Sequence, residues 1–193
     1  MNKQNLQNTL GATETIGQWG VGQSHDFVLT NLDTPWIAEL LEELNENFDP
    51  ASATFSQQTP SLEVSINVLR RMTPAFGNHL VVRGSLKTTY LTQCVRCLVN
   101  MTDELESDFV ACFTEQGDVE NPLLHDTDMT VVNGEEMELH FHQNQKVDFK
   151  EFIHEQLYLH LNQLPLHDPD CKGLDQGTGM NLNEFDKEIR PSL

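Results

Sequence analysis

Apolar and polar residues alternate along several stretches of the chain in the pattern of half-buried strands. Residues 61–72 alternate most regularly and predict a strand with one buried face. Residues 79–91 and 99–113 are apolar and β-branched stretches on either side of a short turn, and they predict a hairpin that follows this strand. Two shorter stretches complete the pattern, a first strand at residues 25–30 and an edge hairpin within residues 131–142 with Asn-Gly at its turn.

Two other stretches have helical spacing. The first begins after a capping Asp33 or Thr34, has Pro35 at its first position and ends near Asn47, with glutamates on the face opposite its apolar stripe. The second begins at Asp148, with Glu151 three residues later as in a capping box, and its apolar spacing continues until Pro165. Both segments are therefore predicted to be amphipathic helices.

The predicted strands and helices are segregated along the chain, which favours an α+β fold. We expect a bent antiparallel β-sheet, open or partly closed into a barrel, with the two amphipathic helices packed on it. Residues 1–24 are rich in Asn, Gln, Gly and Thr and predict a loosely ordered N-terminal arm. Residues 25–190 are expected to form a single domain with the C-x-x-C hairpin at 94–97.

The chain has a net charge of −19, which disfavours a protein whose whole surface binds nucleic acid, because that affinity comes mainly from Lys and Arg. Residues 64–102 nevertheless contain no acid, and they hold five basic residues. Arg83 and Lys87 are four apart and share one face of a strand, Arg96 lies in the hairpin turn, and of the adjacent Arg70 and Arg71 only one can join that face. These residues are candidates for contact with RNA or another partner. The alternative is that strands lack acids simply because Asp and Glu are poor strand formers.

The chain shows no apolar stretch long enough for a membrane helix and no signal-peptide pattern, so we expect a cytoplasmic protein without a membrane partner. It also shows no nucleophile elbow, phosphate-binding glycine loop or paired-histidine metal motif. We therefore expect neither catalysis nor a small-molecule substrate.

Cys94 and Cys97 at the hairpin turn form half of a tetrahedral zinc site, which needs four ligands. No second cysteine pair exists, because Cys112 lies inside a strand, where it is expected to pack as a small hydrophobic residue, and Cys171 stands alone in the C-terminal part. We expect no cofactor and a metal-free hairpin. The alternative is a structural zinc bound by Cys94, Cys97 and Cys171, with Asp175 as a weak fourth ligand.

Three blocks resemble the YceD family, the large ribosomal RNA subunit accumulation proteins. They are the hairpin with Cys94-x-x-Cys97-Leu98, the acidic helix that leads to Leu164-Pro165, and a tail that runs from Cys171-Lys172-Gly173-Leu174 to Asn181-Leu182-Asn183. Family members with the full pattern have a second C-x-x-C directly after Gly-Leu, where this chain has Asp175 and Thr178.

The resemblance implies a non-enzymatic ribosome-biogenesis factor that supports accumulation or maturation of large-subunit rRNA. Its expected partner is a large-subunit precursor, contacted through rRNA or through a basic ribosomal protein. The alternative is a small cytoplasmic adaptor, dependent on zinc or thiols and unrelated to ribosomes.

Overall fold

The structure is a computed structural model that describes residues 9–48, 58–115, 129–132 and 134–183. Within these residues, six strands form one sheet in the order β2-β3-β4-β5-β7-β6, and β1 pairs with β8 in a separate two-stranded sheet. The strands are β1 (Thr13–Thr15), β2 (Ser24–Thr30), β3 (Ser61–Thr73), β4 (Gly77–Gln93), β5 (Asn100–Glu115), β6 (Met129–Val132), β7 (Glu135–His142) and β8 (Lys146–Asp148). The helices are α1 (Pro35–Asn45), α2 (Phe149–His160) and the short 3-10 helix η1 (Ile16–Gln18).

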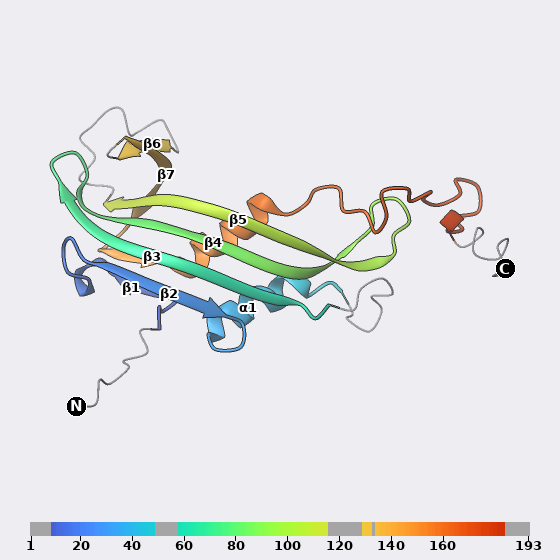
Figure 1. Cartoon of the computed structure of the whole chain (residues 1–193), viewed down its shortest axis with the longest axis horizontal. Coiled ribbons are helices and arrows are strands. Elements are labelled where there is room, and N and C mark those ends of the chain that lie inside the picture. Colours follow the sequence, from blue (N-terminus) through green and yellow to red (C-terminus); the bar gives the residue numbers. More distant parts are fainter. Residues whose placement is uncertain (1–8, 49–57, 116–128, 133, 184–193) are drawn as a thin grey trace.

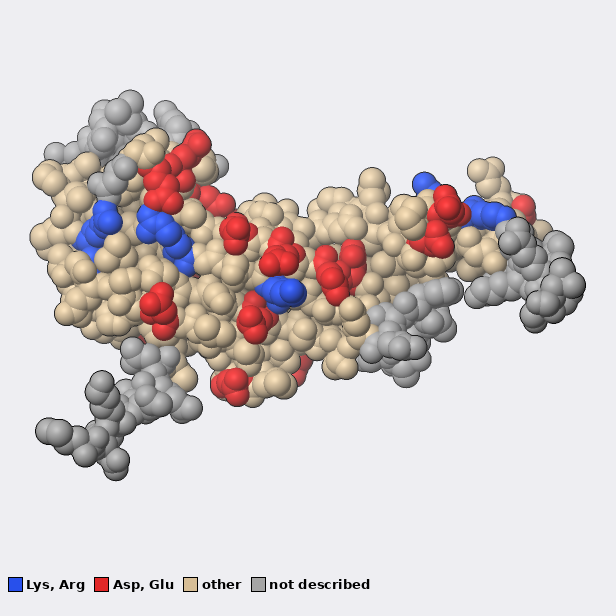
Figure 2. All heavy atoms as spheres, in the orientation of Figure 1, with Lys and Arg blue, Asp and Glu red and all other residues tan. Residues whose placement is uncertain are grey.

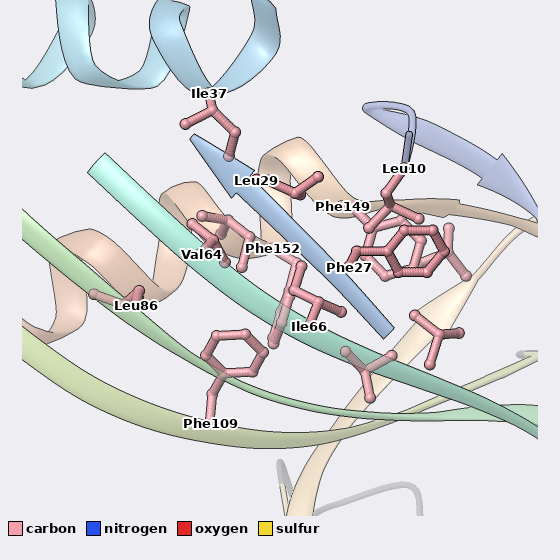
Figure 3. Packing of buried hydrophobic residues seen from close by; sticks show 14 of the residues in the cluster. Leu10, Phe27, Leu29, Ile37, Val64, Ile66, Leu86, Phe109, Phe149 and Phe152 are labelled. Atoms are coloured by element: carbon pink, nitrogen blue, oxygen red, sulfur yellow. The ribbon is translucent and has the colours of Figure 1, made fainter. Parts of the chain in front are cut away.

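The architecture confirms the predicted α+β class, with α1 and α2 behind the sheet in the view of Figure 1. The inward residues of β2, β3, β4 and β5 meet the apolar faces of both helices in the main hydrophobic core (Figure 3). Ile37 of α1 and Phe152 of α2 are fully or almost fully buried there, together with Val64 of β3. Asp148 caps α2 as expected, because its carboxylate accepts a hydrogen bond from the backbone N–H of Glu151 at 3.0 Å.

The sheet is open, which is one of the two forms expected, with β2 and β6 at its edges. It differs from the expected antiparallel sheet in one respect: β7 pairs in parallel with β5, although every other pairing is antiparallel. β6 runs antiparallel to β7, so it carries the chain back before β7 begins. Residues 116–128, between β5 and β6, lie outside the described part.

Residues 9–24 are more ordered than their polar composition predicts. Thr13–Thr15 forms β1, which pairs with β8. Leu10, Ile16 and Trp19 are buried in the main core, and the Trp19 ring packs edge-on against Phe149 of α2. These few apolar side chains are enough to fix the segment, because each buries a large area against the end of the sheet.

The β6–β7 hairpin forms a second, smaller core with residues of β4 and β5 that point away from the main core. Its buried members are Phe76, Val81, Cys112, Val132, Met137 and Leu139. Cys112 is fully buried in this cluster, as expected for a small hydrophobic residue, and burial raises the pKa of its thiol to about 12.

The β4–β5 hairpin determines the shape of the molecule. It is paired in a continuous register from Leu80 with Phe113 to Gln93 with Asn100. Its tip extends beyond α1 and α2, and the C-terminal segment lies beside this tip (Figure 1). Among the described helices, none is long and apolar enough to cross a membrane.

Candidate metal centre

The tip of the β4–β5 hairpin is a tight turn that contains the C-x-x-C pair. The Cys94 N–H donates to the Val99 carbonyl at 3.0 Å, and the Leu98 N–H donates to the Cys94 carbonyl at 2.9 Å. Leu98 has a φ of 59°, a left-handed conformation that non-glycine residues rarely adopt and that reverses the chain within this turn. Cys94 and Cys97 are both buried at the tip.

The segment after α2 returns to this tip and brings two further donors to the cysteine pair. It is attached to the turn by the Val95 N–H, which donates to the Pro165 carbonyl at 3.0 Å. The three Sγ atoms of Cys94, Cys97 and Cys171 and a ring nitrogen of His167 all lie within 4.8 Å of one another. Two of the separations are 3.8 Å between the Cys94 and Cys171 Sγ atoms and 3.3 Å between Cys97 Sγ and His167 Nδ1.

The fourth side chain of this cluster is His167, and Asp175, the residue expected at this position, is not part of the cluster. The Asp175 carboxylate instead accepts hydrogen bonds within its own loop, from the N–H groups of Gly177 and Thr178 at 3.1 and 2.8 Å and from the Thr178 hydroxyl at 2.8 Å. The hydrogen bonds from Thr178 are the main reason that the pKa of Asp175 lies below its usual value. The spacing His167-x-x-x-Cys171 is the sequence signal that could have identified the second half of the site.

Residues around the four donors make further contacts with the returning segment. Arg96 Nη1 donates to the carbonyls of Cys171 at 2.9 Å and of Pro169 at 3.3 Å. Gly173 has a φ of 78°, and a side chain there would also approach the Arg96 carbonyl to 3.2 Å, so glycine suits this position for two reasons. The Asn183 amide lies 3.4 Å from Cys171 Sγ and can donate to it.

The electrostatics of the cluster favour one thiolate even without a metal. Burial would raise the pKa of the Cys94 thiol, but hydrogen bonds from the His167 side chain and from the backbone of His167, Cys97 and Arg96 outweigh it and lower the pKa to about 5. Burial raises the pKa of Cys97 to about 11, and the neighbouring Cys171 and Cys94 contribute to this shift. A second thiolate in this buried group therefore requires a compensating positive charge.

The donor set fits Zn²⁺ in chemistry and in spacing. Three thiols and one imidazole are a common ligand combination of structural zinc sites. In a tetrahedron with Zn–S bonds of about 2.3 Å, two sulfurs lie roughly 3.8 Å apart, which agrees with the separation of Cys94 Sγ and Cys171 Sγ. A disulfide would require the two sulfurs to approach to about 2 Å. If a zinc ion binds, all four of its ligands come from the protein, which is the arrangement of a structural site rather than a catalytic one.

The basic residues that the sequence singled out do not gather at this tip, apart from Arg96. Arg70 donates from Nη1 to the Trp19 carbonyl at 2.7 Å and from Nε to Asn78 at 2.8 Å, so it holds the N-terminal segment. Arg83 forms an ion pair with Glu135 of β7. The hydrogen bond from Arg83, followed by the charges of Arg83 and Arg71, lowers the pKa of Glu135.

Lys87 lies between acidic residues of both neighbouring strands. It is paired in register with Glu63 of β3 and with Glu106 of β5, and its ammonium group is 3.9 Å from the Glu106 carboxylate. Residues 64–102 contain no acid, but the surface around Lys87 does contain acidic side chains, because β3 and β5 supply Glu63 and Glu106 on either side of it.

Comparisons with known proteins place the chain in a family. Residues 82–192 match the family model of YceD, described as large ribosomal RNA subunit accumulation protein. The searches of curated proteins and of solved structures found no match. The matched part is more than half of the chain, and it contains most of β4, all of β5, α2 and all four donors of the candidate metal centre. The chain therefore belongs to the YceD family of large ribosomal RNA subunit accumulation proteins.

Proposed function

We propose that this protein is a non-enzymatic factor that supports the accumulation of large-subunit rRNA by binding a precursor of the large ribosomal subunit. The observation that carries the proposal is the family match over residues 82–192. The match includes most of the hairpin and the segment that returns to its tip, so it covers the candidate metal centre as well as α2.

The described side chains support a binding role rather than catalysis. Among these side chains, one cluster could bind a metal ion, and its four protein ligands would leave no open position on a tetrahedral ion for a substrate. The thiols of this cluster are buried, so a substrate has little access to them. A factor of this kind acts by occupying a surface of the precursor.

We propose further that its direct partner is a basic ribosomal protein and that the outer face of β5 makes the contact. Glu104, Glu106 and Asp108 alternate along β5 and are all exposed. Figure 2 shows carboxylates distributed along the length of the visible face, whereas the basic side chains gather mainly at its two ends. The cations of this region, Arg83 and Lys87, already lie next to carboxylates, which reduces their attraction for RNA phosphates. Such a surface complements the Lys- and Arg-rich tails that ribosomal proteins expose before assembly.

The first experiment is affinity capture of the tagged full chain from growing cells, followed by sedimentation through a sucrose gradient. The proposal predicts recovery of the protein with particles that contain large-subunit rRNA. Recovery only in the free pool at the top of the gradient would contradict it.

A pair of charge variants tests the contact surface. Glu104→Lys with Asp108→Lys should release the protein from the particles at a lower salt concentration, because the attraction across the interface is reversed. Glu42→Lys with Glu46→Lys changes the net charge equally at two exposed positions, one in α1 and one directly after it, and is the matched control. Equal effects of the two variants would mean that only net charge matters. A greater effect of Arg83→Gln with Lys87→Gln would favour direct contact with rRNA instead.

A further inference from the structure

The hairpin tip has a core of its own, separate from the main core of the body. It is formed by Cys94, Cys97, Met101 and Cys171, with the partly buried Val99, Leu166 and Leu174 packed against it. Three of its four buried members are candidate metal ligands, so few of its side chains contribute purely apolar burial. The main core instead contains aromatic and branched aliphatic residues from β2 to β5 and both helices. The two parts therefore obtain their stability from different sources.

The segment that completes the tip contains little regular structure of its own. Between the end of α2 and Asn183, its regular pairing among the described residues is a single bridge between Leu174 and Asn181. Among the described residues, its one backbone–backbone hydrogen bond to the hairpin runs from the Val95 N–H to the Pro165 carbonyl. Side-chain hydrogen bonds from Arg96 and from the Asn162 amide to Asp103 of β5 add to it. Ordering a loop of this length costs about 1–2 kcal/mol per residue in backbone entropy. These hydrogen bonds and the small apolar core leave most of that cost uncompensated.

We propose that one Zn²⁺ binds Cys94, Cys97, His167 and Cys171, and that this ion folds the tip onto the returning C-terminal segment while the body folds without it. Four bonds to ligands from two distant parts of the chain would provide the stabilisation that the small core lacks. Zinc binding and the folding of the tip do not depend on the ribosomal role of the protein.

The metal content is tested on the full chain purified under reducing conditions. Elemental analysis should find one zinc per chain. Replacement of zinc by Co²⁺ should give the intense visible absorption of a tetrahedral site with thiolate ligands. Asp175→Ala should leave both results unchanged, whereas His167→Ala and Cys171→Ser should lower metal retention at least about tenfold in a chelator competition. His167→Cys keeps a zinc ligand at this position and should retain the metal.

The folding claim is tested by hydrogen exchange measured by mass spectrometry, with and without a zinc chelator. Exchange should become about tenfold faster or more in residues 94–101 and 165–183, and it should stay unchanged in β3 and α1. Cys112→Ala serves as the control for removal of a buried thiol outside the cluster.

Three outcomes would overturn the proposal. The first is a protein that contains no zinc and does not take it up from solution when fully reduced. The second is bound zinc whose removal leaves exchange at the tip unchanged, because the ion would then not be needed for folding. The third is loss of protection in the body together with the tip, because the two parts would then fold as one unit.

Discussion

Gly84→Ala should destabilise the protein strongly, because Gly84 lies where β3, β4 and β5 pack most closely. A Cβ at this position would be 2.1 Å from the Ser65 carbonyl oxygen and 2.6 Å from Cζ of Phe109. The carbonyl belongs to the backbone of β3, so it cannot move without disturbing the ladder between β3 and β4. The Phe109 ring is held in turn by its edge-on contact with Phe152 at 5.3 Å.

The size of the effect follows from these contacts. Overpacking a well-packed core typically costs about 1–3 kcal/mol, and we expect about 3 kcal/mol here because one of the clashing atoms belongs to the backbone. For a chain of this length each kcal/mol lowers Tm by roughly 2–4 °C, so Tm should fall by about 6–12 °C. Circular dichroism during heating measures this shift.

Gly177→Ala is the matched control for this prediction. A Cβ at Gly177 would meet only the Asp175 carboxylate at 3.5 Å, an ordinary contact distance. This variant should keep the wild-type Tm or raise it slightly, because alanine restricts the unfolded chain. If Gly84→Ala also unfolded at the wild-type temperature, the three central strands could not be packed as closely as described.

Three further predictions concern single side chains. Asp148→Ala removes the cap of α2 and should cost about 1 kcal/mol, or roughly 2–4 °C in Tm, whereas Asp148→Asn should keep most of it. Burial raises the pKa of the Cys112 thiol to about 12, so in the folded protein this thiol should resist alkylation at pH 8. Its contribution to the free energy of unfolding is fully present below about pH 9 and should be lost as the pH rises toward 12, because the thiol ionises more easily in the unfolded chain. Lys150 of α2 forms ion pairs with Glu39 and Glu43 of α1, at 2.8 and 3.1 Å. Because these pairs are exposed, Lys150→Ala should lower the free energy of unfolding by less than about 1 kcal/mol, measured by chemical unfolding, and by less still at high salt.

Much of the fold could be predicted from local patterns. The alternation in residues 61–72 corresponds to β3, and the capping pair Asp148 and Glu151 corresponds to the start of α2. The parallel pairing of β7 with β5 could not be predicted, because strand alternation specifies which face is buried and not which neighbour is paired. The helical pattern up to Pro165 also overestimated α2, which ends at His160 before the chain turns toward the hairpin tip.

The site could be predicted only in part. The sequence named three of the four side chains of the cluster, Cys94, Cys97 and Cys171, but it missed His167, because a single histidine is not distinctive unless its segment is known to return to the tip. The acid-free segment was misleading in a different way. Net charge along a sequence does not give charge on a surface, because Lys87 is flanked by Glu63 and Glu106 from other parts of the chain.

The most direct test of the proposed function is the ratio of large-subunit to small-subunit rRNA in cells depleted of this protein. The account predicts that this ratio falls on depletion and that the wild-type chain restores it. An unchanged ratio after complete depletion, with ribosomal particles of normal abundance, would contradict the proposed function.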